Sequence, residues 1–265
     1  MNRIGMSIII SHPDKLSIEE QIKVFAEIGF DSFFLSCGVT DEYDRIPQWA
    51  ELAQRCGIVF EAVHAPSDGM NAVWIKDTAG DAYMARIGRI VEYCSDGGVE
   101  KLVMHVSGGD ALPVNSCGLD RYAVLETRAK SCGVRLCYEN GDRIDHLEAV
   151  LARSDPFHGF CYDCGHEACY TLDAMLLKKW GNRLLYTHLH DNRGYGCGDL
   201  HWMPFDGVCD WAVLATGFVS CGYTGTLNLE LACHSNAAYG EMPYADFVRA
   251  AKDRAVRFGE MLKNY

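Results

Sequence analysis

Histidine and carboxylate side chains recur in this sequence directly after short apolar runs, where a buried strand would ordinarily end in an apolar residue or a turn former. Imidazole and carboxylate groups are common protein ligands of divalent cations, and clustered carboxylates would repel one another without a cation between them. The pattern therefore indicates a metal centre, provided that the fold brings the runs together. The six runs are Val63-His64-Ala65-Pro66, Met104-His105-Val106, Cys137-Tyr138-Glu139-Asn140, Tyr162-Asp163-Cys164-Gly165-His166, Thr187-His188-Leu189-His190-Asp191 and Asn228-Leu229-Glu230-Leu231.

Two short motifs extend this set of candidate ligands. Asp163-x-x-His166 adds a second donor to its own run, and Asp199-x-His201 adds two more donors further along the chain. The whole set is sufficient for one to three ions. An alternative stays open, in which about four of these residues bind metal and the others hydrogen-bond to the ligands. The candidates are His64, His105, Glu139, Asp163, His166, His188, Asp199, His201 and Glu230.

The elements that must position these residues are short β-like runs that alternate with longer amphipathic stretches, a pattern typical of repeated βα units on a parallel sheet. Eight such units in a chain of 265 residues favour a closed barrel over a doubly wound sheet. We therefore predict the α/β class and a single (β/α)8 TIM barrel. The expected strands are Ile4–Ile10, Asp31–Leu35, Ile58–Val63, Lys101–Val106, Val134–Tyr138, Gly159–Tyr162, Leu184–Leu189 and Thr226–Leu229.

Local signals mark where the intervening helices begin and end. Ser17 and Glu20 form the pattern of a capping box, and glycines follow several helical runs directly before a strand. No linker or shift of composition divides the chain, so residues 1–265 are interpreted as one domain. The long loops follow the third, fourth and seventh strands, on the face where barrel enzymes hold their active sites. They are Ala65 to Thr78, Ser107 to Cys117 and Asp191 to Val208.

Composition limits the class of partner. A hydrophobic fraction of 49% is sufficient for a large core, and the formal net charge of -12 repels polyanions. The charge therefore disfavours nucleic acid and anionic membranes as partners. No apolar run approaches the roughly 20 residues that span a bilayer, so we expect a cytoplasmic protein. The oligomeric state stays open, a homo-oligomer included.

The chain contains thirteen cysteines, scattered and mostly inside apolar runs. We interpret them as reduced core residues, because disulfide frameworks belong to short secreted chains. Cys161-x-x-Cys164 has the spacing of a redox or zinc pair, but its strand-like context favours packing.

Taken in order, the motifs resemble the xylose-isomerase-like TIM-barrel superfamily. The resemblance rests on His64-Ala-Pro, His105, Glu139-Asn, Asp163-x-Gly-His166, His188-Leu-His-Asp-Asn, Asp199-x-His201 with Pro204-Phe-Asp-Gly207, and Glu230. It runs from about Ile4 to the last helix. The superfamily contains sugar-phosphate isomerases and epimerases together with type IV apurinic endonucleases.

In the isomerase and epimerase branch, the resemblance implies one catalytic metal held by Glu139, Asp163, His188 and Glu230. It also implies that Glu139 and Glu230 move a proton next to a carbonyl, through an enediolate that the metal stabilises. Zinc or manganese are the expected ions, with cobalt, iron or magnesium as alternatives. In the endonuclease branch all nine candidates would hold three zinc ions. The ligand types alone therefore leave both branches open.

A small carbohydrate is the expected substrate, and a sugar or sugar-phosphate isomerase or epimerase is the leading hypothesis. Rival hypotheses are a metal phosphodiesterase for abasic DNA, a dehydratase or lyase, and a non-catalytic metal-binding or sugar-sensing barrel. Few basic residues lie on the long loops, which disfavours DNA. The glycines of Ser107–Gly109 and Gly194–Gly198 are consistent with a phosphate site but favour simple turns. Trp74, His190 and Arg193 are the candidate substrate-binding residues.

Overall fold

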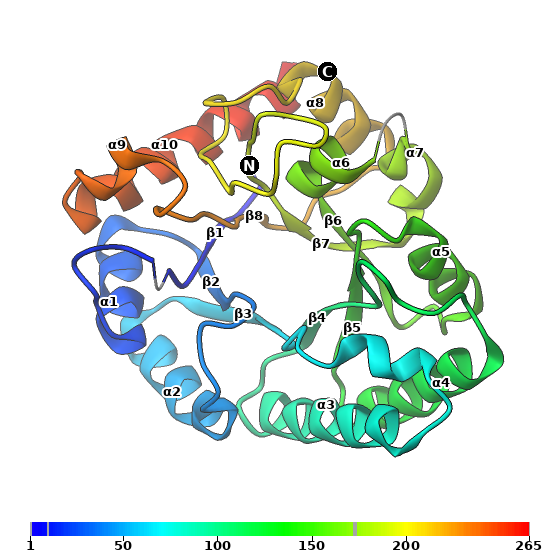
Figure 1. Ribbon diagram of the computed structural model, residues 1–265. Coiled ribbons are helices and arrows are strands. Elements are labelled where there is room, and N and C mark those ends of the chain that lie inside the picture. The colour runs from blue at the N-terminus through cyan, green and yellow to red at the C-terminus, as the bar shows by residue number, and fades with distance from the viewer. Residues whose placement is uncertain (1, 10, 172–173, 265) are drawn as a thin grey trace.

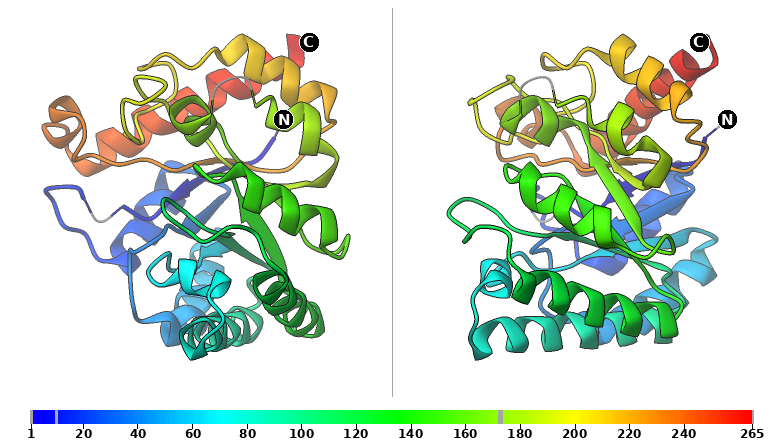
Figure 2. Two further views of the ribbon diagram at one scale, coloured as in Figure 1. Left: turned by 45° about the vertical axis from the view of Figure 1, so that its right-hand side comes forward. Right: turned by 90° about the vertical axis from the view of Figure 1, so that its right-hand side faces the viewer.

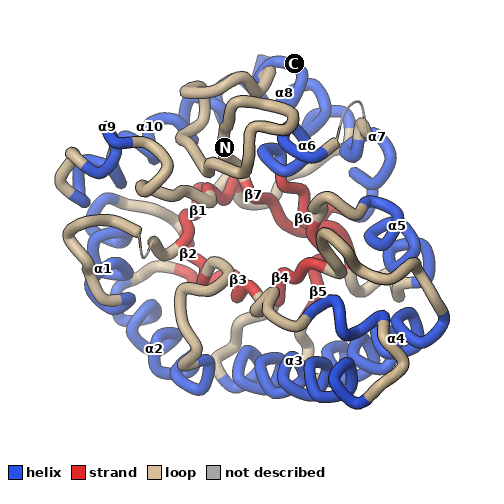
Figure 3. The backbone as a smooth tube through the Cα atoms, in the orientation of Figure 1, coloured by secondary structure: helices blue, strands red, loops and turns tan. Residues whose placement is uncertain are grey.

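The computed structural model describes residues 2–9, 11–171 and 174–264. Eight parallel strands form a ring at the centre, and helices surround it (Figures 1 and 3). Neighbouring strands follow the order β7-β6-β5-β4-β3-β2-β1-β8, and a parallel bridge between Leu189 and Leu229 joins the two ends. This confirms the predicted (β/α)8 TIM barrel. The strands are β1 (Ile4–Ser7), β2 (Ser32–Leu35), β3 (Val59–His64), β4 (Lys101–His105), β5 (Arg135–Glu139), β6 (Gly159–Asp163), β7 (Leu184–His188) and β8 (Leu227–Leu229).

Each predicted strand overlaps an observed one, although the observed β1 ends at Ser7. The predicted end of that strand, Ile10, lies outside the described residues. Strands β3, β4, β5, β6 and β7 each include the ligand candidate as their last residue. The carboxyl ends of the strands therefore carry the candidate site.

The helices cover the outside of the barrel, which Figure 2 shows from two further directions. The predicted capping box is present, because Ser17 accepts from the backbone of Glu20 while the Glu20 carboxylate accepts from the backbone of Ser17. The helices are α1 (Ile18–Ile28), α2 (Ile46–Cys56), α3 (Thr78–Asp96), α4 (Ser116–Ser131), α5 (Ile144–Arg153), α6 (Cys164–Tyr170), α7 (Leu176–Trp180), α8 (Trp211–Ser220), α9 (Ala237–Gly240) and α10 (Tyr244–Met261). Single 3₁₀ turns lie at Tyr43–Arg45, Met70–Trp74, Gly181–Arg183 and Leu262–Asn264.

The interior of the barrel contains a layer of buried side chains that is separate from the larger core between sheet and helices. Successive residues of a strand point to opposite faces, so a residue two positions later points into the barrel as well. The candidate ligands of β3 to β7 stand two residues after members of this layer, at the carboxyl end. The layer consists of Phe34, Ala62, Val103, Cys137, Cys161 and Tyr186.

All thirteen cysteines lie in the described part of the chain and are free thiols. Cys161 and Cys164 are both buried, which agrees with the packing interpretation. Among the described residues, no helix is both long and apolar enough to cross a bilayer. The interpretation of residues 1–265 as one domain stays a prediction.

Gly57 ends α2 in the left-handed region at φ 71°, where its N–H bonds the carbonyl groups of Ala53 and Gln54. A Cβ at this position would meet nothing within 4 Å, so substitution strains the backbone without a clash. We expect Gly57→Ala to lower the free energy of unfolding by roughly 1 to 2 kcal/mol. Gly57→Asn should cost less, because asparagine tolerates this conformation. Urea unfolding tests both variants, and equal losses would contradict the backbone argument.

Candidate metal centre

The four residues predicted to hold one catalytic metal do converge. Ligand atoms of Glu139, Asp163, His188 and Glu230 lie within 4.8 Å of one another, and we call these residues the central group. His188 Nδ1 lies 2.7 Å from Glu139 Oε1 and 3.1 Å from Glu230 Oε2. All four side chains are buried. Parallel register places Asp163 directly beside His188 on the neighbouring strand.

A second group shares Glu139 with the first. His64, His105 and Glu139 have ligand atoms within 4.8 Å of one another. Glu139 Oε2 lies 2.8 Å from His64 Nε2 and 3.4 Å from His105 Nε2. Strand register pairs His105 with Glu139 on adjacent β4 and β5. Glu139 is therefore in a position to bridge two cation sites.

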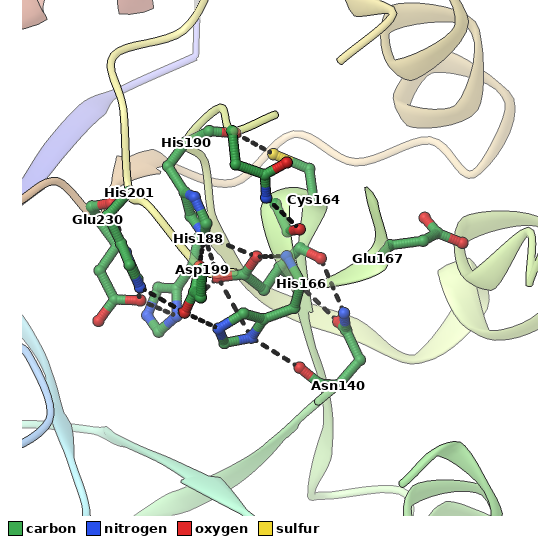
Figure 4. Close-up of polar contacts among 12 residues, drawn as sticks. Asn140, Cys164, His166, Glu167, His188, His190, Asp199, His201 and Glu230 are labelled. Carbon is green, nitrogen blue, oxygen red and sulfur yellow. Dashed lines mark hydrogen bonds and ion pairs between the residues drawn. The ribbon is translucent and has the colours of Figure 1, made fainter. Parts of the chain in front are cut away.

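A third group lies where α6 meets the loop of residues 191–208, and we call it the flanking group. It comprises His166, His190, Asp199 and His201. Asp199 Oδ2 lies 2.9 Å from His166 Nε2 and 2.8 Å from His201 Nε2, and Figure 4 shows these contacts. All nine predicted ligands thus fall into three adjoining groups.

The charges of the three groups compensate one another in the absence of a metal. Burial alone would raise the pKa of Glu139, but the neighbouring His188 and His105 outweigh it and hold the pKa well below its usual value. Burial opposes protonation of His201, yet the hydrogen bond and charge of Asp199 raise its pKa to about 9. Burial instead lowers the pKa of His105 to about 4, so its imidazole is neutral at pH 7.

The donor set fits a divalent cation. Four carboxylates and six imidazoles are held in fixed positions, and such mixed nitrogen and oxygen donors suit zinc or manganese. Asp199 Oδ1 is buried and has no hydrogen-bond partner among the described residues, although buried carboxylate oxygens are normally satisfied. A cation at the flanking group would satisfy this atom.

The three candidate substrate-binding residues lie in different environments. Trp74 is only 1% exposed, donates from Nε1 to the carbonyl of Val106 and packs edge-on against His146, so it belongs to the core. His190 is fully buried beside Asp163. Arg193 is exposed on the loop of residues 191–208, with its guanidinium 5.0 Å from the centre of the Trp202 ring. Of the three, Arg193 alone has an exposed side chain, and the substrate-binding role of these residues stays a prediction.

Two supporting residues complete the centre. Ser36 follows β2 and donates its hydroxyl to Glu230 Oε1, a contact that the search for ligand types missed. Ser36 stands two residues after Phe34, the same spacing that relates the ligand candidates of β3 to β7 to the apolar layer. Asn140 exchanges hydrogen bonds of 2.8 Å with the backbone N–H and carbonyl of Asp163 and so fixes the end of β6.

Comparison with known proteins agrees with this geometry. Residues 22–254 match the family model described as xylose isomerase-like TIM barrel. The chain belongs to this family. The resemblance drawn from the motifs is thereby confirmed.

Several solved structures share the fold over nearly their whole length. A D-tagatose 3-epimerase-like protein is 19% identical with a TM-score of 0.79, covering 99% of this chain and 98% of that one. A D-psicose 3-epimerase with D-tagatose from Clostridium cellulolyticum H10 is 15% identical with a TM-score of 0.77, covering 98% and 99%. The IOLI protein with a binding zinc atom is 15% identical with a TM-score of 0.79, covering 98% of each chain. At these identities the likeness shows the fold.

A curated relative, the uncharacterized protein y4fM of Sinorhizobium fredii (strain NBRC 101917 / NGR234), is 34% identical over 113 residues. The match spans 38% of this chain and 36% of that protein.

Zinc added to the stripped protein should raise the melting temperature, and should raise it more at pH 8 than at pH 6. The carboxylates raise the pKa of His188 and bring the pKa of His201 to about 9, so both rings hold protons at pH 6 that a metal must displace. Each displaced proton should weaken binding about tenfold for each pH unit below the pKa of its ring. Thermal melts with and without zinc measure the effect. A shift that is equal at both pH values would contradict metal binding through these imidazoles.

Proposed function

We propose that the protein is a divalent-metal-dependent isomerase or epimerase of a sugar or sugar phosphate. The observation that carries this proposal is the central group, in which four buried donors from β5, β6, β7 and the end of β8 surround one point. The fold neighbours named as sugar 3-epimerases support the substrate class. A bound cation would polarise the carbonyl and the adjacent hydroxyl of the substrate as a Lewis acid.

The two glutamates are the proposed acid and base, and their surroundings differ. Both oxygens of Glu139 face imidazoles, with Oε1 at 2.7 Å from His188 Nδ1 and Oε2 at 2.8 Å from His64 Nε2. In Glu230 only Oε2 faces His188, while Oε1 accepts the Ser36 hydroxyl. A serine hydroxyl can reorient as the carboxylate gains or loses a proton. Glu230 is therefore our first choice as the base that removes the proton next to the carbonyl.

The enediolate then has two fates. Delivery of a different proton to the same carbon from the opposite side, with Glu139 as the proposed acid, gives an epimer, and Glu230 keeps the proton that it removed. Delivery of a proton to the neighbouring carbon gives an isomer. Expulsion of a hydroxyl group instead would make the enzyme a dehydratase or lyase, with a product lighter by one water.

A second candidate function is a metal phosphodiesterase of the type IV apurinic endonuclease class. The observation in its favour is that all nine candidate ligands fall into three adjoining groups, two of which share Glu139. Against it stand the net charge of -12 and the few basic residues on the long loops.

The substrate class can be tested with a panel of ketohexoses and ketopentoses, free and phosphorylated, incubated with zinc- or manganese-loaded protein in deuterated water. We expect at least one member to give an epimer or isomer with deuterium at the carbon next to the carbonyl. Proton NMR identifies the labelled position, and mass spectrometry detects loss of water. If no member gains deuterium or changes while the metal is bound, the proposal is wrong for these sugars.

Glu230→Gln should lower kcat by about 10²- to 10⁴-fold, the usual contribution of a general acid or base. Glu139→Gln should also weaken metal binding, because Glu139 joins two donor groups. Glu92→Gln is a matched control, since this carboxylate is exposed on α3 beside Arg128. Metal analysis accompanies the kinetics. Near wild-type turnover by metal-loaded Glu230→Gln would exclude Glu230 as the base.

The endonuclease hypothesis predicts salt-dependent binding to a duplex that contains an abasic site. We expect neither binding nor strand cleavage by the zinc-loaded protein, even at low ionic strength, because the chain is strongly acidic. Gel-shift and nicking assays measure both, with an intact duplex as the control. Cleavage confined to the abasic duplex would favour the second candidate function.

A further inference from the structure

Two cysteines, neither of them a candidate ligand, lie where the loop of residues 191–208 meets α6. Cys169 is buried near the end of α6, and Cys197 is exposed on the loop. The backbone N–H of Gly196 donates to the carbonyl of Cys169 at 3.0 Å, so the two segments are in contact one residue before Cys197. Figures 1 and 2 show this loop beside α6.

The sulfur of Cys169 is also in contact with the loop. Burial and the charges of Asp199 and of a Cys197 thiolate raise the pKa of the Cys169 thiol. The charge of His166 and a hydrogen bond from the Gly198 N–H oppose that rise. The carbonyl of Cys169 thus bonds the residue before Cys197, and its sulfur bonds the residue after it. A disulfide requires such an approach, since it joins Cα atoms only about 4.4 to 6.8 Å apart.

The backbone on both sides of Cys197 is free to adjust. Gly196 and Gly198 have φ values of 74° and 83°, a region that glycine enters readily. A Cβ added at either position would meet nothing within 4 Å, so this turn has no close packing against the described residues. Small changes of the turn therefore suffice to bring the Cys197 sulfur onto that of Cys169.

We propose that Cys169 and Cys197 form a reversible disulfide that links the loop of residues 191–208 to α6. The oxidant is a low-molecular-weight disulfide such as oxidised glutathione. The exposed Cys197 sulfur attacks it, and the resulting mixed disulfide releases one reduced glutathione. The Cys169 sulfur then attacks Cys197, and the second reduced glutathione leaves. The two thiols give up two electrons, and their two protons end on the two released glutathione molecules.

The position of the disulfide determines what it does. Cys197 precedes Asp199 by two residues, and Cys169 follows His166 by three. Asp199 Oδ2 already lies 2.9 Å from His166 Nε2, so a covalent link beside this pair fastens the loop in the position that keeps the two side chains together. The proposal does not depend on the reaction catalysed at the central group.

Cys164 and Cys209 are the competing pair of thiols. Burial and the charge of Cys209 raise the pKa of the Cys164 thiol, which places the two near each other. Each of them has a hydrogen-bond partner, because Cys164 Sγ donates to the carbonyl of His190 at 3.2 Å and the Cys209 thiol bonds Asp191. Neither thiol is exposed, so we expect this pair to stay reduced.

The test begins with wild-type protein treated with oxidised glutathione. The remaining thiols are alkylated after denaturation, and chymotrypsin then cuts the chain at aromatic residues. This cleavage places Cys169 and Cys197 in separate peptides, 163–170 and 196–202. We expect mass spectrometry to find the two peptides joined, fragmentation to assign the bond to Cys169 and Cys197, and dithiothreitol to separate them.

Two serine variants and a control separate the steps. Cys169→Ser should trap the intermediate, with one glutathione on Cys197, and Cys197→Ser should take up none at Cys169. Cys56→Ser removes a half-buried thiol at the end of α2, and it should form the disulfide as the wild type does. The wild-type digest decides the question even where a variant does not fold.

Trypsin measures whether the disulfide fastens the loop. Cleavage after the exposed Arg193 should be about tenfold slower in oxidised than in reduced wild-type protein, because the link suppresses local opening. Cys197→Ser, treated in the same way, should be cut at one rate in both states.

Three results would overturn the proposal. The first is wild-type protein in which Cys169 and Cys197 stay reduced, or in which a mixed disulfide persists on Cys197. The second is a disulfide that joins Cys164 to Cys209 in place of the proposed pair. The third is tryptic cleavage that is equally fast in the oxidised and reduced wild type, which would mean that the bond does not hold the loop.

Discussion

The structure depends on the burial of three carboxylates in one layer of the barrel interior. Glu139, Asp163 and Glu230 are each 5% exposed or less, and an unpaired buried carboxylate is strongly unfavourable. Imidazoles from neighbouring strands supply the compensation, and a cation would supply it more completely. The barrel carries this electrostatic cost directly above its apolar layer. A purely structural barrel would fill the same positions with apolar groups, so the buried charges indicate a binding site.

The alternation of side chains along parallel strands delivers these groups to one place. Phe34 precedes Ser36, Ala62 precedes His64 and Cys137 precedes Glu139, each by two residues. The same spacing relates Tyr186 to His188. The donors therefore lie next to an apolar layer, on the side of the carboxyl ends of the strands. One residue of slippage in any strand would turn its donor outward toward the helices and remove it from the centre.

The sequence was sufficient to predict the barrel and the convergence of the candidate ligands, because both follow from short-range patterns. Alternation of β-like and helical runs predicts the eight strands, and the unusual ends of six of them predict the site. Trp74 shows what this reasoning does not distinguish, since a tryptophan in a long loop has the same local signature whether it lines a mouth or, as here, is buried and donates to the carbonyl of Val106. The contacts of Ser36 and His190 could be recognised only from the structure, because their partners lie 194 and 27 residues away in the sequence.

The donors of the centre differ in their exposure. His105, Asp199 and His201 have side chains 18%, 20% and 21% exposed, whereas the central donors lie deeper. His105 follows the end of β4, whereas Asp199 and His201 lie on the loop of residues 191–208, so the exposed donors stand on two sides of the central group. The first and second groups share Glu139, so any chemistry that uses two cations belongs to that pair. A Glu139 that bridged two cations would be less available for protons, which supports the proposed choice of Glu230, held by Ser36, as the base.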